Sequence, residues 1–318
     1  MSQVRNDDSP LRRPKVSVCV ITYNQERYIG QCLQSLVDQQ TDFGFEVIVG
    51  DDCSTDGTRT VVETFADRYP SIIRTIYQPA NTGGSRNNLQ VHAAALGDYV
   101  AHVDGDDYAL PGKLQAQANA LDRNPNCTAV WHLVDYFDDS GGYCSGGTAD
   151  LSLFEGGKLD FALSARLGFI GVHSSLMYRR SARSLVDLDQ RILDVYSTWD
   201  LLSKGGGVYL DAVLGRYRVN APGSITVNSQ RRIRGLAISH ARYFALKFPE
   251  QRRNFFLWAI CAAIVDAKNL HASAFMMLRF ALRQFSLVSP RQVLSNLRDQ
   301  RRVQVRWRQR DRNAMGVR

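Results

Sequence analysis

The sequence predicts an α/β fold, in which a mostly parallel sheet is flanked by helices and is followed by a helical C-terminal extension. Two observations predict the sheet. Apolar, β-branched runs of strand length alternate with segments of helical periodicity, and polar clusters follow three of these runs. A third observation predicts the extension, because residues 231 to 318 show helical periodicity alone. Ligands of such sheets bind at the carboxyl ends of the strands, so the polar clusters are the candidate site.

The elements follow in a regular order after residues 1 to 14, a charged segment without periodicity that we expect to be disordered. Strands are expected at 16–21, 45–49, 72–77, 99–103 and near 128–134. Helices are expected at 28–37, 58–69, 87–95, after Pro111 and around 194–204, with a glycine-rich hairpin at 138–147. The last four helices are expected at 233–246, 255–270, 274–285 and 290–307. This order divides the chain into a leader (1–14), an α/β domain (15–228) and a basic helical region (229–318).

Charge is distributed unevenly along the chain. Residues 231 to 318 hold 19 of the 39 lysines and arginines but only 4 of the 31 acidic residues. The six cysteines form no C-x-x-C pair, which favours a reducing compartment over a zinc site. No secretory signal is evident, and the apolar run at 255–265 is much shorter than the roughly 20 residues that span a bilayer. We therefore expect a cytoplasmic protein, peripheral on the inner face of the plasma membrane.

The strand at 45–49 leads into Asp51 and Asp52, followed by Ser54, Thr55 and Asp56. Carboxylates at a strand end can accept hydrogen bonds from a base imide or a ribose hydroxyl, whereas they would repel a phosphate. The alternative for 54–56 is a turn that caps the next helix. The first strand is followed by no G-x-G-x-x-G motif, so a dinucleotide-binding domain is disfavoured.

The strand at 99–103 ends in D-G-D-D, which places three carboxylates in residues 104 to 107. Such carboxylates repel one another unless a cation lies among them. Oxygen ligands of this kind suit Mg²⁺ or Mn²⁺, which need only one or two protein carboxylates when a diphosphate and water complete the coordination. The alternative is a solvated acidic turn.

Three segments together resemble the GT-A glycosyltransferases of family 2. They are V-S-V-C-V-I-T-Y-N through E-V-I-V-G-D-D-C-S-T-D-G-T (16–58), N-T-G-G-S-R-N (81–87) and G-D-Y-V through D-G-D-D (97–107). The resemblance extends to about residue 226. It implies a GT-A fold with a mixed sheet and an inverting, metal-dependent transfer of a sugar from a nucleotide-sugar, a UDP-sugar, to a hydroxyl of a glycan or lipid-linked acceptor. The pathway implied is cell-surface polysaccharide biosynthesis.

The resemblance assigns roles residue by residue. Thr22, Tyr23 and Glu26 match the loop around the nucleotide, and Asp52 with Asp51 matches the aspartate that reads uracil. Arg86 matches a basic residue near the diphosphate that could also hold Asp106, with a surface arginine as the alternative. Asp106 and Asp107 match the metal and ribose carboxylates of the DXD-type motif. The residues assigned to the nucleotide are Thr22, Tyr23, Glu26, Asp51, Asp52, Arg86, Asp104 and Asp106, and those assigned to Mn²⁺ or Mg²⁺ are Asp106 and Asp107.

Inversion requires a carboxylate base that takes the proton of the acceptor hydroxyl. Asp194, eleven residues before Gly205, matches the family base, and Asp200 is its rival under a shifted alignment. A helix carboxylate with a purely structural role is the third interpretation. His173 and Arg218 match positions near the acceptor or the diphosphate, although a lone histidine is more often structural. Asn220 replaces a histidine found in many relatives, which puts any metal or phosphate role at that position in doubt.

The basic C-terminal helices have three interpretations. Their apolar faces could pack on the catalytic domain or on a second subunit of a homodimer, with the arginines exposed to water. They could bind an anionic membrane, where each basic residue adds about 1 kcal/mol. Nucleic-acid binding is disfavoured because no reading motif is present. A catalytically inactive GT-A scaffold and a metal-dependent nucleotidyltransferase are the alternative functions, although the latter would need a Gly-rich basic loop after the first strand.

Overall fold

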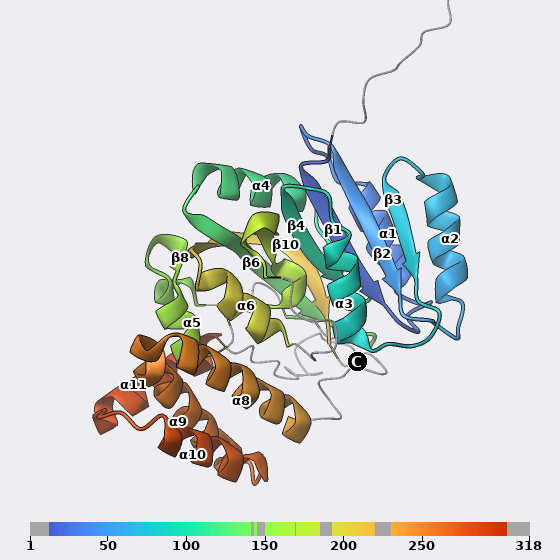
Figure 1. Ribbon diagram of the computed structural model, residues 1–318. Coiled ribbons are helices and arrows are strands. Elements are labelled where there is room, and N and C mark those ends of the chain that lie inside the picture. Colours follow the sequence, from blue (N-terminus) through green and yellow to red (C-terminus); the bar gives the residue numbers. More distant parts are fainter. Residues whose placement is uncertain are drawn as a thin grey trace, which may run out of the picture.

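The computed structural model describes residues 13–140, 143–144, 150–168, 170–184, 193–219 and 230–303, and it has the predicted α/β body with a helical lobe beside it (Figure 1). Ten strands of the described chain form one sheet in the order β3-β2-β1-β4-β9-β6-β10-β5, with β7 paired to β6 and β8 to β10. The strands are β1 (Val16–Thr22), β2 (Phe45–Asp51), β3 (Ile73–Tyr77), β4 (Tyr99–Asp104), β5 (Tyr108–Ala109), β6 (Cys127–Phe137), β7 (Tyr143–Cys144), β8 (Lys158–Leu159), β9 (Met177–Arg179) and β10 (Gly206–Arg218).

The sheet is mixed, as the family resemblance implied. Strands β3, β2, β1 and β4 run parallel, and so do β6 and β10. The short strand β9 lies between these two groups and is antiparallel to β4 and to β6. The prediction of a mostly parallel sheet is therefore correct within each group, whereas β9, which joins the two groups, is antiparallel to its neighbours.

Helices cover both faces of the sheet because side chains alternate along each strand. In β1, Val16, Val18 and Val20 pack with α1 and α4 on one face, whereas Cys19 belongs to the core beneath α3, α5 and α6 on the other. The helices are α1 (Ile29–Val37), α2 (Thr58–Arg68), α3 (Gly84–Ala93), α4 (Lys113–Arg123), α5 (Phe161–Leu167), α6 (Asp194–Leu202), α8 (Gln230–Lys247), α9 (Arg252–Lys268), α10 (Ser273–Arg283) and α11 (Pro290–Val303).

Helix α3 lies unusually close to β2, and Gly50 makes this possible. A Cβ atom at Gly50 would lie 2.2 Å from a methyl group of Val91. The Asn87 side-chain amide donates to the Gly50 carbonyl at 2.8 Å, which fixes the helix on the strand. This contact places the start of α3 beside the end of β2.

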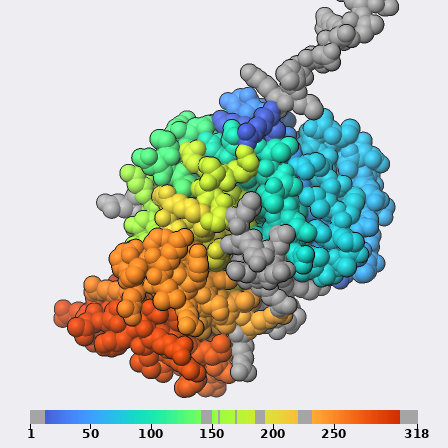
Figure 2. Space-filling model, in the orientation of Figure 1, coloured from blue at the N-terminus to red at the C-terminus, as the bar shows by residue number. Residues whose placement is uncertain are grey.

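The C-terminal helices form a lobe that shares its core with the α/β body (Figures 1 and 2). Trp199 of α6 is fully buried, and its ring lies 5.1 Å from that of Phe255 and 5.8 Å from that of Trp258, both on α9. Within the described ranges, no helix is both long enough and apolar enough to span a membrane. The predicted leader up to residue 12, Asn220, part of the predicted hairpin and the basic segment after residue 303 lie outside the described residues.

Candidate active site

The candidate site lies where β1, β2 and β4 reach the same edge of the sheet. In the strand register Thr22 is paired with Asp51, and Ile21 with Asp104. The loops that follow these three strands are therefore neighbours, although they are distant in the sequence. The polar clusters predicted to form a site are brought together at this edge.

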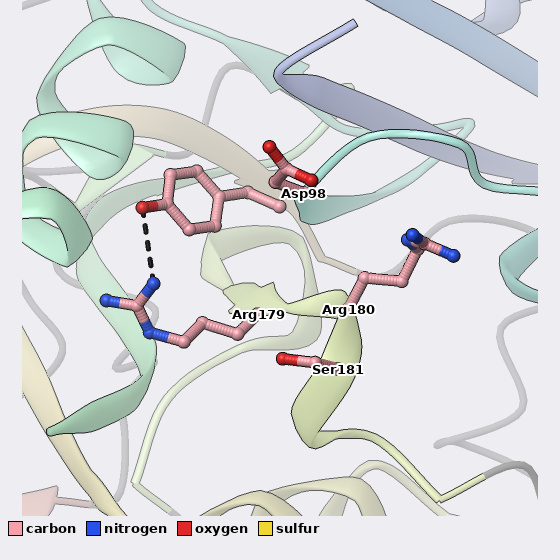
Figure 3. Close-up of a pocket in the computed structure, with 5 residues that line it drawn as sticks. Asp98, Arg179, Arg180 and Ser181 are labelled. Carbon is pink, nitrogen blue, oxygen red and sulfur yellow. Dashed lines mark hydrogen bonds between the residues drawn. The ribbon is translucent and has the colours of Figure 1, made fainter. Parts of the chain in front are cut away.

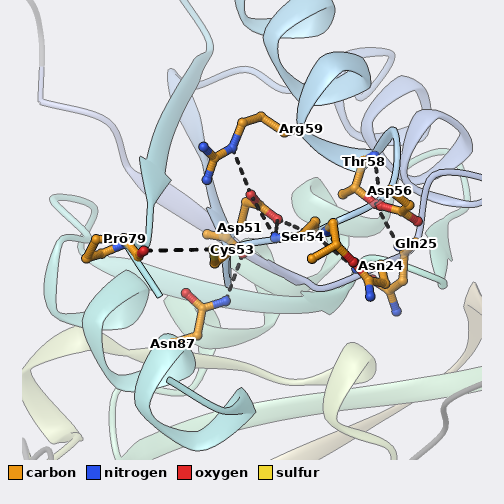
Figure 4. A network of polar contacts seen from close by, with 12 residues as sticks. Asn24, Gln25, Asp51, Cys53, Ser54, Asp56, Thr58, Arg59, Pro79 and Asn87 are labelled. Carbon is orange, nitrogen blue, oxygen red and sulfur yellow. Dashed lines mark hydrogen bonds and ion pairs between the residues drawn. The ribbon is translucent and has the colours of Figure 1, made fainter. Parts of the chain in front are cut away.

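The loop after β1 is joined to the loop after β2 by polar contacts (Figure 4). The backbone N–H of Asn24, which has a φ of 52°, donates to the Ser54 hydroxyl, and its side-chain oxygen accepts from the N–H of Thr55 at 2.8 Å. The carboxylate of Glu26 accepts from the N–H of Gly57 at 2.6 Å. Thr22 is buried, whereas Tyr23 is 43% exposed. Of the three residues predicted to surround the nucleotide, Thr22 is thus buried, whereas Tyr23 and Glu26 are exposed, with the Glu26 carboxylate bonded to the loop after β2.

Asp51 and Asp52 are both buried and both accept hydrogen bonds from the chain itself. Asp51 accepts from Ser54 and from the Arg59 guanidinium, whose Nε lies 3.1 Å away. Asp52 accepts from the N–H groups of Thr82 and Gly83 at 2.7 and 2.8 Å. These carboxylates fix the loops around the site, and a role in reading the base remains a prediction.

Thr82 and Gly83 precede α3, and Gly83 has a φ of 85°, a conformation that favours glycine. Arg86 lies in the first turn of α3, with its backbone N–H bonded to the Gly83 carbonyl at 3.0 Å. Asp52 therefore holds the start of the helix that carries Arg86, the residue expected near the diphosphate.

The three carboxylates of the acidic loop have different environments. The Asp104 side chain is 39% exposed and lies 3.0 Å from His102. Burial would raise the pKa of Asp104, but the interaction with His102, which includes a hydrogen bond, lowers this pKa below the ordinary value. Burial, together with the Asp104 charge, raises the pKa of Asp106 to about 6. Asp104 and Asp106 are therefore the two carboxylates of this loop that are available at the sheet edge.

Asp107 is turned inward, which does not support its prediction as a metal ligand. It is 2% exposed and accepts from the backbone N–H of Arg218 at 2.8 Å and from the Ser174 hydroxyl. The buried Lys113 donates to the Ser174 carbonyl at 2.6 Å. Burial and the charges of Asp106 and Asp104 raise the pKa of Asp107 well above its ordinary value. Asp107 thus anchors the acidic loop to β10.

Asp194 and His173 face each other. Asp194 starts α6, has a side chain that is 60% exposed, and lies 3.4 Å from Nδ1 of His173. Burial, followed by the neighbouring His102, lowers the pKa of His173 to about 4, so this ring is neutral at physiological pH. Asp194 is therefore a solvent-accessible carboxylate with a neutral imidazole beside it.

Asp200, the rival base, is 3% exposed and is held in a buried contact. Its oxygens accept from the N–H and hydroxyl of Ser184 at 2.8 and 3.0 Å, and from Lys204 at 2.9 Å. This arrangement is that of the structural helix carboxylate, the third interpretation of the sequence.

Arg218, expected near the acceptor or the diphosphate, is engaged elsewhere. Its side chain is 8% exposed, pairs with Asp139, and packs between the rings of Tyr28 and Phe137 at 4.2 and 4.3 Å. Its Nε donates to the Asp106 carbonyl at 3.1 Å. Arg218 therefore supports the acidic loop from behind, and the structure does not support a direct contact with a diphosphate.

Among the described residues, no group of three or more His, Cys, Asp and Glu side chains could by itself hold a metal ion. A pocket with a volume of about 420 Å³ lies at the opposite edge of the sheet, where β4 begins and β9 ends (Figure 3). Its Arg179 and Arg180 donate to backbone carbonyls of Cys127 and Gly97 at 2.8 Å. These arginines are structural, and the pocket is remote from the acidic loop.

The family model described as Glycosyl transferase family 2 matches residues 17–185, just over half of the chain. The chain belongs to this family. An uncharacterized protein of Mycobacterium tuberculosis is 41% identical over 127 residues, which are 40% of this chain and 37% of that protein. Poly(ribitol-phosphate) beta-N-acetylglucosaminyltransferase TarS of Staphylococcus aureus is 37% identical over 113 residues, or 35% of this chain and 19% of TarS. The chain thus spans well under two thirds of the length of these two relatives.

Two solved structures of glycosyltransferases share the fold. The structure of a TarS fragment in complex with UDP-GlcNAc aligns with a TM-score of 0.58 at 21% identity, covering 77% of this chain and 72% of that one. The mannosyltransferase PcManGT of Pyrobaculum calidifontis, in complex with GDP-Man and Mn²⁺, aligns with a TM-score of 0.53 at 18% identity, covering 92% of this chain and 85% of that one. The predicted GT-A fold is confirmed.

Sequence reasoning missed the histidines beside the site of this family 2 protein. His92 of α3 and His102 of β4 are buried, and the ring of His102 lies 3.6 Å from that of His173. These residues come from three separate segments, so only tertiary packing brings them together. The one signal was His102 itself, a polar residue within an otherwise apolar strand.

Proposed function

We propose that the chain is an inverting glycosyltransferase that moves a sugar from a UDP-sugar to a hydroxyl of a glycan or lipid-linked acceptor. The observation that carries this proposal is the meeting of two carboxylate sites. Asp104 and Asp106 lie at the end of β4, Asp194 lies at the start of α6, and the stacked rings of His102 and His173 connect them. Family membership supports the reaction type, and the UDP-GlcNAc complex of TarS supports the donor class.

Asp194 is the proposed base. Its exposed oxygen takes the proton of the acceptor hydroxyl as that hydroxyl oxygen bonds to the anomeric carbon, while the bond from this carbon to the diphosphate oxygen breaks and the diphosphate leaves with the electron pair. A base works best when a third group orients it. The neutral His173, 3.4 Å from Asp194, is suited to that role. The buried contact of Asp200 favours Asp194 over its rival.

Mn²⁺ or Mg²⁺ is the proposed cofactor, and the chemistry of the acidic loop fits it. Asp106 has a raised pKa because it is buried and because its charge is held close to that of Asp104, an arrangement that a cation would stabilise. Asp106, with Asp104 beside it, would supply the one or two carboxylates that such a cation needs when a diphosphate is also bound. A bound cation would neutralise charge on the departing diphosphate. Asp107 is buried and is left out of this proposal.

The remaining predicted residues have proposed roles in holding the donor. Tyr23 is exposed on the loop after β1, where its ring can pack against a base. Asp51 and Asp52 shape the nucleotide pocket through the loops that they hold. Arg86, at the start of α3, is the proposed contact to the diphosphate. The name of TarS supports an acceptor in cell-surface polymer synthesis.

Calorimetry with UDP tests this proposal. The wild-type protein should bind UDP more tightly with Mn²⁺ than without it, and Asp106→Asn should lose the effect of the metal. Asp67→Asn, at an exposed position of α2, is the matched control for losing one carboxylate. Absence of UDP binding by the wild type, or binding indifferent to Mn²⁺, would remove the UDP and metal assignments and favour the inactive scaffold.

We also propose that the C-terminal lobe binds an anionic membrane, which would bring the enzyme to a lipid-linked acceptor. Of the twelve large apolar side chains that are exposed in the described chain, ten lie between residues 243 and 294. On α10, Phe275, Leu278 and Leu282 are 72%, 40% and 63% exposed, and their spacing places them on one face. Arg279 and Arg283 flank this face and are exposed too. Apolar side chains bordered by arginines are typical of helices that lie in a membrane interface.

Cosedimentation with phosphatidylcholine vesicles, with and without phosphatidylglycerol, tests this surface. Binding should require the anionic lipid and should fall in Leu282→Asp, whereas Leu96→Asp, at an exposed position of the α/β body, should bind like the wild type. Equal binding by Leu282→Asp would contradict the proposal. A stable dimer that dissociates in Leu282→Asp would assign the same face to a second copy of the chain.

A further inference from the structure

A chain of four hydrogen bonds runs through the protein interior to Asp104. It begins at the Arg183 guanidinium, which lies 2.9 Å from the Tyr178 hydroxyl. The hydroxyl lies 2.8 Å from Nδ1 of His92, and Nε2 of His92 lies 2.9 Å from Nδ1 of His102. Nε2 of His102 then lies 3.0 Å from Asp104. Tyr178, His92 and His102 are at most 4% exposed.

The hydrogens of this chain can point in only one direction. A guanidinium only donates, and an ionised carboxylate only accepts. Nδ1 of His102 must accept, because the Asn88 oxygen accepts from Arg183 and the Asn88 amide nitrogen therefore donates to this ring nitrogen. Nε2 of His92 then donates to Nδ1 of His102, and Nδ1 of His92 accepts from the Tyr178 hydroxyl. His102 in turn donates through Nε2 to Asp104. Both histidines are therefore neutral imidazoles with the proton on Nε2, in keeping with the burial that lowers the pKa of His92 well below its ordinary value.

A second arm reaches the same histidine. The other terminal nitrogen of Arg183 donates to the side-chain oxygen of Asn88 at 3.0 Å, and the Asn88 amide nitrogen lies 3.4 Å from Nδ1 of His102. Arg183 is thus connected to His102 through Tyr178 and His92 on one side and through Asn88 on the other. Two arms from one guanidinium leave the His102 ring little freedom to rotate.

The His102 ring also contacts the part of the site that contains the proposed base, Asp194. His102 and His173 stack with ring centres 3.6 Å apart and an angle of 21° between their planes. Nδ1 of His173 lies 3.4 Å from Asp194. Nε2 of His102 therefore holds Asp104 through a hydrogen bond, and the face of the same ring packs against His173, which lies beside Asp194.

We propose that His102 is a positioning residue. The two hydrogen-bonded arms from Arg183, which we call the brace, hold its ring in place. The ring can then orient Asp104 toward the donor and align His173 beside Asp194. This inference rests on the proposed function for the roles of Asp104 and Asp194. The brace itself is a property of the folded chain and can be tested without any ligand.

Nitrogen-15 NMR of the histidine side chains tests the brace in the free, full-length protein. His92 and His102 should both appear as neutral Nε2–H tautomers at neutral pH. The His102 signals should shift in Asp104→Ala and much less in Asp106→Ala. A proton on Nδ1 of His102, or signals insensitive to Asp104, would overturn the brace.

UDP calorimetry in the presence of Mn²⁺ tests the positioning role. His102→Phe keeps a ring but removes the donor to Asp104, whereas His102→Gln keeps an N–H at the place of Nε2. His132→Phe is the matched control, because His132 of β6 is equally buried and, among the contacts of the described chain, its ring makes one hydrogen bond, from Nδ1 to the Leu133 carbonyl at 2.8 Å. Outer partners of a site typically change affinity about 10-fold to 100-fold, so we expect a loss of about tenfold in His102→Phe.

His102→Gln should recover most of that affinity, and His132→Phe should retain it. Wild-type affinity in His102→Phe would overturn the inference, and so would an equal loss in all three variants, which would indicate a packing effect alone. If the wild type binds no UDP, the proposed function fails, while the NMR experiment still decides whether the brace exists.

Discussion

Replacing Asp106 by asparagine should stabilise the folded protein at neutral pH, because this change removes a charge that the fold holds at an unfavourable place. Burial and the neighbouring Asp104 raise the pKa of Asp106 from 3.8 to about 6. The folded state therefore binds more protons than the unfolded state between these two pH values, and stability falls as the pH rises through this window. Asparagine has no such dependence.

The magnitude follows from the size of the shift. A difference of one pKa unit corresponds to about 1.4 kcal/mol, so the unfavourable contribution of ionised Asp106 reaches about 2 to 3 kcal/mol above pH 6. At pH 7, Asp106→Asn should unfold at a higher denaturant concentration than the wild type. At pH 4 the two proteins should have nearly the same stability, since Asp106 is then largely protonated in the folded state.

Denaturant unfolding at a series of pH values, without metal and then with Mn²⁺, measures this difference. Mn²⁺ should stabilise the wild type and not the variant. Asp67→Asn controls for the general effect of one charge. A variant that is no more stable than the wild type at pH 7, or a difference that persists unchanged at pH 4, would refute the reasoning about Asp106.

Three further predictions concern other parts of the molecule. Asp194→Asn should lower turnover about a thousandfold and leave UDP affinity unchanged, as expected for a lost base. Asp200→Asn should instead lower thermal stability. Turnover of Asp194→Asn equal to that of the wild type would contradict the assignment. Gly168→Ala should destabilise the folded protein by about 2 to 3 kcal/mol, because Gly168 has a φ of 84° and a Cβ there would lie 2.3 Å from Trp258. This loss of stability should be smaller when Trp258 is also replaced by alanine. Additive losses from the two substitutions would exclude the clash. Asp52→Ala leaves two amide donors without their acceptor and should lower the free energy of unfolding by about 2 kcal/mol in urea; unchanged stability would show that the loop does not depend on Asp52.

The order of strands and helices from β1 to β4 could be predicted because each of these elements carries its own periodicity. The runs at 16–21 and 45–49 became β1 and β2, and their carboxyl ends meet as expected. Strand β9, at Met177–Arg179, was indicated only by the resemblance of residues 172–178 to a strand of the family, because three residues hold too little periodicity to indicate a strand or its direction. Its antiparallel place between β4 and β6 follows from tertiary pairing.

The candidate site was predicted by residue type but not by side-chain direction. Asp104, Asp106 and Asp107 stand together in the sequence, yet Asp107 points inward because Ser174 and the backbone of Arg218 accommodate it. The sequence contains no signal for those partners, since they lie on η3 (His173–Ser175) and β10. The same reason explains why Arg218 was expected to face a ligand, although it packs behind the loop.

The position of α6 between the sheet and the C-terminal lobe has a consequence for building hybrid enzymes. One face of this helix presents Trp199 to Phe255 and Trp258, and its first residue is Asp194. A chimera that joins this α/β body to the C-terminal helices of another family 2 protein would change the surface on which α6 rests. Such exchanges should succeed only when α6 is transferred together with the helices that support it.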